Sequence, residues 1–98
     1  MAVRLDLNNP VFQRQWFALA KEDQLAVFAS LFKLSRMSWD QVYRDKGLRW
    51  ELVHSRQSPD GSRLYSIRIT RKVRAVARRS GDFIELFTLH ADHDSAYE

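Results

Sequence analysis

The sequence contains no cysteine, and this absence excludes disulfides, thiolate metal sites and a cysteine nucleophile. A chain without cysteine suits a reducing compartment, so we expect it to act in the cytoplasm. No apolar run approaches the ~18 residues that a membrane-spanning helix needs. The first residues lack the basic segment followed by an apolar stretch that marks a signal peptide, so none is predicted.

Internal repeats, low-complexity segments and linkers are also absent from the sequence. The 98 residues are close to the common size of one domain, and 45% of them are hydrophobic. That share is enough for a packed core without disulfides or a structural metal. We therefore predict one domain, residues 1–98, that needs no cofactor.

Arginine is abundant, and its distribution is uneven. Basic residues outnumber acidic ones by 16 to 12, and twelve of the basic residues are arginines. Seven of the basic residues lie between positions 63 and 79: Arg63, Arg68, Arg71, Lys72, Arg74, Arg78 and Arg79. Because the planar guanidinium matches phosphate bidentately, this cluster favours a polyanionic partner. A solvated strand surface is the alternative interpretation.

The N-terminal half shows helical periodicity. Asn9 and Pro10 are typical of a helix start, and the apolar face that follows them contains Phe12, Trp16 and Leu19. A second helix is expected to begin near Glu22, with a core-facing stripe of Leu25, Phe28, Ala29 and Phe32. Ser38 and Gln41 predict the capping box of a third, short helix that stops at Gly47.

After Gly47 the apolar period changes to two, which is typical of strands. The alternation covers residues 48–53, 65–70, 73–79 and 83–89, with turn signals at 58–62 and 80–82. The predicted class is α+β with a small antiparallel sheet: a three-stranded C-terminal meander plus an N-terminal edge strand at residues 3–6. The N-terminal helices are expected to pack on one face of this sheet.

The other face of the sheet would then be open to a ligand. If Trp50, Tyr65, Ile67 and Ile69 point toward the helices, alternation places Glu51, Arg68 and Arg74 together on the open face. The basic residues of the C-terminal half would then form a surface on the uncovered sheet.

The C-terminal run from His90 to Tyr97 brings proton-transfer groups near these arginines. Metal-free RNA cleavage needs a base for the ribose 2′-OH, an acid for the 5′-oxygen, and cations for the phosphate. Histidine suits either proton role, and Tyr97 could stack on a base. A metal site is a second interpretation, although the spacing of His90, Asp92, His93 and Asp94 matches no specific metal motif. A solvated polar tail without chemistry is the third.

The motifs of the C-terminal half follow one another in a characteristic order. Trp50-Glu51 comes first, followed by Leu64 to Thr70, Val73 to Val76, Phe83 to His90, and Asp92 to Tyr97. In this order and spacing, the chain from about Gly47 to Tyr97 resembles the RelE/ParE superfamily of bacterial type II toxins. The helical half resembles that superfamily only in outline.

The resemblance to the RelE-like branch implies a ribosome-dependent endoribonuclease that cleaves messenger RNA in the ribosomal A site without metal. Carried over by position, the implied catalytic residues are Arg68, Arg74, His93, Tyr97, His90 and Glu51. Arg74 would stabilise the phosphate, and His93, or His90 in its place, would be the general acid or base. Additional RNA-binding cations are predicted at Arg63, Arg71, Lys72 and Arg78.

The same resemblance implies partners and two alternatives. A RelE-like toxin acts on the ribosome and its mRNA, and a cognate antitoxin inhibits it by covering the basic face with an extended or helical segment. A homodimer and a toxin–antitoxin hetero-oligomer are both compatible with the sequence. One alternative is a ParE-like protein that inhibits DNA gyrase, which needs no proton transfer. The other is a non-catalytic nucleic-acid-binding module on the same fold.

Overall fold

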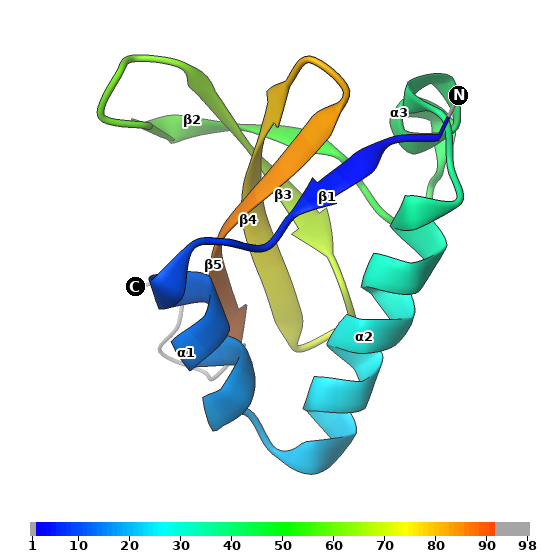
Figure 1. Cartoon of the computed structure of the whole chain (residues 1–98), viewed down its shortest axis with the longest axis vertical. Coiled ribbons are helices and arrows are strands. Elements are labelled where there is room, and N and C mark those ends of the chain that lie inside the picture. The colour runs from blue at the N-terminus through cyan, green and yellow to red at the C-terminus, as the bar shows by residue number, and fades with distance from the viewer. Residues whose placement is uncertain (1, 92–98) are drawn as a thin grey trace.

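The computed structural model describes residues 2–91, which form a five-stranded sheet and three helices (Figure 1). In chain order the elements are β1 (Arg4–Asp6), α1 (Pro10–Ala18), α2 (Lys21–Ser35), α3 (Trp39–Arg44), β2 (Glu51–Gln57), β3 (Arg63–Arg68), β4 (Val73–Ser80) and β5 (Phe83–Ala91). The strand order across the sheet is β1-β5-β4-β3-β2. The helices pack against the sheet, so the predicted α+β class is confirmed.

The sheet differs from the predicted one in two respects. β2 to β5 form a four-stranded antiparallel meander, one strand more than predicted, because residues 51–57 pair with β3. β1 does lie at an edge, but it pairs in parallel with β5, so the sheet is mixed. A parallel pair needs a long connection, and the chain from α1 to β4 supplies it.

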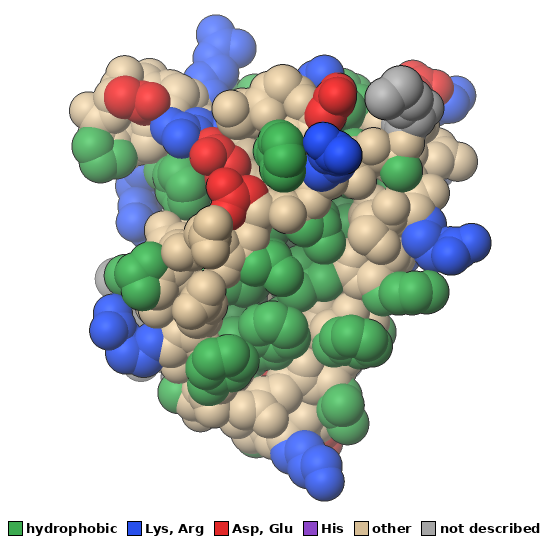
Figure 2. Space-filling model, viewed as in Figure 1, with side chains coloured by type: hydrophobic (Ala, Val, Ile, Leu, Met, Phe, Trp, Pro, Cys, Tyr) green, Lys and Arg blue, Asp and Glu red, His purple; other side chains and the backbone are tan. Residues whose placement is uncertain are grey.

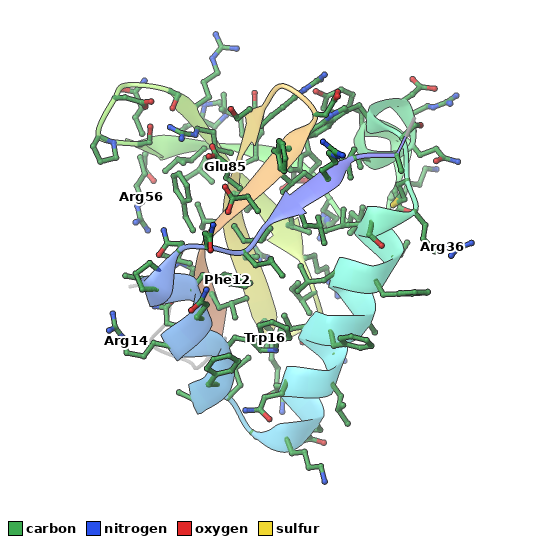
Figure 3. All side chains as sticks on the ribbon, viewed as in Figure 1. Phe12, Arg14, Trp16, Arg36, Arg56 and Glu85 are labelled. Carbon is green, nitrogen blue, oxygen red and sulfur yellow. The ribbon has the colours of Figure 1, made fainter. Side chains whose placement is uncertain are left out.

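The core lies between the helices and one face of the sheet. Phe12 of α1 is fully buried, and Trp16 packs against the same core (both labelled in Figure 3). The predicted start of α1 is confirmed: the Asn9 side chain accepts the Val11 N–H at 2.8 Å, and Pro10 is the first helical residue. The sheet contributes its own fully buried side chains, among them Ile67, Ile84 and Leu86.

α2 buries a different face from the predicted one. Its buried side chains are Val27, Leu31 and Leu34. The predicted core residues Leu25, Phe28 and Phe32 are instead 60%, 59% and 56% exposed, and Ala29 is exposed beside them. The prediction was wrong because α2 carries two apolar stripes. Periodicity identifies both, and only packing on the sheet selects one.

The segment from α3 to β2 sets the entry to the open face. The predicted capping box is confirmed: Gln41 N–H donates to the Ser38 hydroxyl, and Ser38 N–H donates to the Gln41 side chain. α3 ends earlier than predicted, at Arg44 with Asp45 as its C-cap, and Gly47 does not adopt a positive φ. The turn instead rests on Asp45, which accepts the Leu48 N–H at 2.9 Å.

Candidate functional site

Three residues form one row across the open face of the sheet. Arg68 of β3 pairs with Arg74 of β4, and Arg74 pairs with His90 of β5. Directly paired residues of neighbouring strands point to the same face, so the three side chains share it. Glu51 of β2 joins this face because it pairs with Ser66, two residues before Arg68. The predicted grouping of Glu51, Arg68 and Arg74 is thus what the pairing shows.

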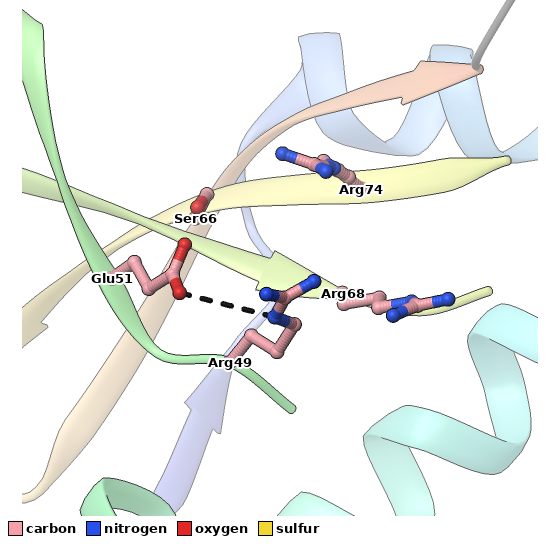
Figure 4. Close-up of a pocket in the computed structure, with 5 residues that line it drawn as sticks. All are labelled: Arg49, Glu51, Ser66, Arg68 and Arg74. Carbon is pink, nitrogen blue, oxygen red and sulfur yellow. Dashed lines mark ion pairs between the residues drawn. The ribbon is translucent and has the colours of Figure 1, made fainter. Parts of the chain in front are cut away.

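A narrow hollow lies where these side chains meet (Figure 4). Its lining residues come from three strands and the loop before β2: Arg49, Glu51, Ser66, Arg68 and Arg74. The enclosed space is only about 10 Å³, so an anion would bind across its rim rather than inside it. Three guanidinium groups against one carboxylate leave the hollow net positive, which suits a phosphate.

Arg49 is a lining residue that the sequence reasoning passed over. Its Nε lies 3.9 Å from Oε2 of Glu51, which makes an exposed ion pair at the rim of the hollow. Its backbone has φ +53°, an uncommon conformation for a residue other than glycine. Arg68 N–H donates to the Leu48 carbonyl at 2.7 Å, which ties this turn to β3. Alternation with Glu51 could have identified Arg49, because both lie on the same side of the predicted strand.

His90 is a strand residue rather than the first residue of a tail, as the sequence had suggested. Its Nε2 lies 2.9 Å from the Thr88 hydroxyl oxygen. Burial lowers the pKa of His90 below its usual 6.5, and the positive charge of Arg56 lowers it further. The imidazole is therefore neutral at pH 7 and able to accept a proton. Arg56 was not predicted, because it lies in a stretch of β2 where the pairing register shifts.

A wider hollow adjoins the first and shares Arg49, Glu51 and Arg68 with it. This open space of about 500 Å³ is also lined by Tyr43, Arg44, Asp45, Lys46 and Trp50. Trp50 stacks on Tyr65 with ring centroids 4.7 Å apart, while Tyr43 is half exposed. Aromatic faces beside cations are the surface on which single-stranded nucleic acid stacks and tracks its backbone.

Arg78, predicted to bind RNA, is engaged with protein groups. Its Nε donates to Glu85 Oε1 at 2.6 Å, and its Nη1 donates to Asp60 Oδ2 at 2.8 Å and to the Ser62 hydroxyl at 3.0 Å. Its guanidinium also lies over the Phe87 ring, 5.2 Å from the centroid. The hydrogen bond to Glu85 raises the pKa of Arg78. These contacts hold the turn between β2 and β3 against the sheet.

Replacing Arg78 by alanine is expected to lower the free energy of unfolding by about 2 kcal/mol, because the partly buried Glu85 carboxylate loses its partner. Urea unfolding measures this change. Arg63→Ala is the matched control at an exposed position, where the change is expected to stay within about 0.5 kcal/mol. Equal effects for the two variants would contradict a structural role for Arg78.

The other predicted residues lie away from the hollow or outside the described part. Arg63 is exposed at the start of β3, opposite Gln57. Arg71 and Lys72, in the connection before β4, line a separate open hollow with Glu22 and Asp23 of α2. His93 and Tyr97 lie outside residues 2–91, so their placement relative to Arg74 stays a prediction.

Comparisons with known proteins give no match: no family model, no curated protein and no solved structure is similar enough to the chain. The RelE/ParE resemblance therefore stays a prediction that depends on the motifs. Within residues 2–91, no three His, Asp or Glu side chains are grouped so that they could hold a metal ion. Over the same range, no helix has the length and apolarity to cross a membrane.

Proposed function

We propose that the chain is a RelE-like toxin, a ribosome-dependent endoribonuclease that cleaves mRNA through attack of the ribose 2′-OH on the adjacent phosphate. The observation that carries this proposal is the row of Arg68, Arg74 and His90, with Glu51 lining the hollow beside it. It supplies phosphate-binding cations and groups able to transfer protons on one open face. Those are the parts that metal-free cleavage of RNA needs.

The geometry assigns the steps of the reaction. The neutral imidazole of His90 takes the proton of the 2′-OH, and the 2′-oxygen forms a bond to phosphorus. Arg68 and Arg74 stabilise the additional negative charge on the phosphate oxygens. The bond to the 5′-oxygen then breaks, and that oxygen takes a proton from a second group, for which Glu51 and His93 are the candidates. The products are a 2′,3′-cyclic phosphate and a 5′-hydroxyl.

The wider hollow offers a path for the neighbouring nucleotide. Tyr43 and Trp50 supply aromatic faces, and Arg44 and Lys46 supply positive charge next to the narrow hollow. An RNA strand that places its scissile phosphate at Arg74 would extend over this surface. A cognate antitoxin that covers the same basic face would block both hollows at once.

The test uses purified protein, translating ribosomes and a defined mRNA, with primer extension to locate the cuts. The proposal expects discrete cuts within codons, and it expects a 2′-deoxy nucleotide at one cut position to abolish that cut alone. The matched control is the unmodified message of identical sequence. Cleavage that persists at the 2′-deoxy position would overturn the mechanism, since the attacking oxygen is then missing.

Two other outcomes identify the alternatives. Intact mRNA together with inhibited supercoiling by DNA gyrase would point to a ParE-like inhibitor. Intact mRNA with salt-sensitive RNA binding and no effect on gyrase would point to a non-catalytic nucleic-acid-binding module. Either result would overturn the nuclease proposal.

A further inference from the structure

α2 carries an apolar stripe on its exposed side, formed by Leu25, Phe28 and Phe32. Phe17 of α1, which is 68% exposed, continues the stripe where the Gln24 side chain donates to the Phe17 carbonyl at 2.8 Å. Figure 2 shows hydrophobic side chains gathered over α1 and α2. Because an aromatic side chain has an area of about 150–250 Å², these four expose roughly 400 Å² together. An apolar patch of that size marks an interaction surface.

The two ends of the stripe carry opposite charge. Glu22 lies in the first turn of α2, and Arg36 follows its last residue with its guanidinium 5.6 Å from the Phe32 ring centroid. Figure 3 shows Arg36 projecting away from the body of the protein. Helical spacing places Glu22, Ala29 and Arg36 on the same face as the stripe. A uniformly acidic or basic partner would match only one end of this surface.

We propose that the occupant of this surface is a second copy of the chain, with the two α2 helices packed antiparallel about a two-fold axis near Phe28 and Ala29. A two-fold arrangement brings each acidic end opposite the basic end of the other copy, so the surface complements itself. Leu25 of each copy then lies opposite Phe32 of the other. The small side chain of Ala29 leaves room for the Phe28 ring.

The size of the patch agrees with a dimer interface. Each partner of a stable dimer buries about 800 Å², and the apolar patch provides about half of that area as a central core. The charged and polar residues around it supply the rim. This dimer leaves the face with Arg68 and Arg74 open, since α2 packs on the opposite side of the sheet. The dimer and the nuclease proposal therefore stand or fall separately.

Sedimentation at several protein concentrations tests the proposal. The wild-type chain is expected to be a dimer, and Phe28→Glu is expected to raise the dissociation constant at least ~30-fold, as for a central apolar residue. Phe83→Glu is the matched control, because Phe83 is an exposed phenylalanine at the start of β5, beside Arg4. A monomeric wild-type chain, or equal dissociation constants for the two variants, would overturn the proposal.

Single cysteines test the antiparallel register, because the chain has none of its own. Ala29→Cys places two thiols near the two-fold axis and is expected to cross-link through a short reagent. Ser35→Cys, which is also exposed, places the two thiols about 20 Å apart along the helices, and it is expected not to cross-link. Efficient cross-linking through Ser35→Cys but not Ala29→Cys would indicate another arrangement and overturn this one.

Discussion

Replacement of Arg74 by alanine is expected to lower the rate of mRNA cleavage by about 10²–10³-fold, the usual cost of losing one group that stabilises transition-state charge. Arg74 lies between Arg68 and His90 in the cross-strand row and lines the narrow hollow. A phosphate held there gains negative charge as the 2′-oxygen attacks. Rates of cleavage on programmed ribosomes, measured at saturating protein, report this loss.

Two further variants separate charge placement from total charge. Arg74→Lys keeps the charge but loses the planar fork, so it is expected to recover only part of the rate. Arg63→Ala removes one charge from the same protein at an exposed position outside the hollow, and its rate is expected to stay near that of the wild type. Equal losses for Arg63→Ala and Arg74→Ala would mean that the basic surface acts only through its net charge.

The features that the sequence predicted well depend on local chemistry. Asn9 and Pro10 define the start of α1 through contacts within a few residues, and Ser38 with Gln41 does the same for α3. Strand alternation is equally local, which is why Glu51, Arg68 and Arg74 were expected on one face. The buried face of α2 depends on the sheet and on α1. Both of its stripes have helical spacing, and the exposed one is richer in phenylalanine.

The parts of the site that were missed depend on contacts between distant segments. Arg78 looked like a free cation of the basic segment, but Asp60 precedes it by 18 residues and Glu85 lies on the next strand. Arg56 acts on His90 from a stretch of β2 with irregular pairing, which alternation does not reveal. Local pattern thus placed the central row, and tertiary contacts decide which cations around it remain available to a ligand.

The acidic limb of the pH–rate profile is expected to depend on His90. As a base, His90 must be neutral, so cleavage should rise with pH through its pKa, which lies below 6.5 because of burial and Arg56, and then level off. His90→Ala is expected to lower the plateau by about 10²–10⁴-fold. Arg56→Ala is the matched variant: without that positive charge the pKa rises, and the limb moves to higher pH with its plateau kept.

The same pKa makes folding depend on pH, and the sign of that effect separates the two readouts. The folded pKa of His90 lies below its unfolded value, so the unfolded state binds the proton more tightly. The contribution of His90 to stability is therefore complete above pH 6.5 and falls as the pH drops through that value toward the folded pKa. Urea unfolding across this range identifies the part of any rate loss that comes from unfolding. An acidic limb that is identical in wild type and Arg56→Ala, with folding intact, would assign the titrating base to another group.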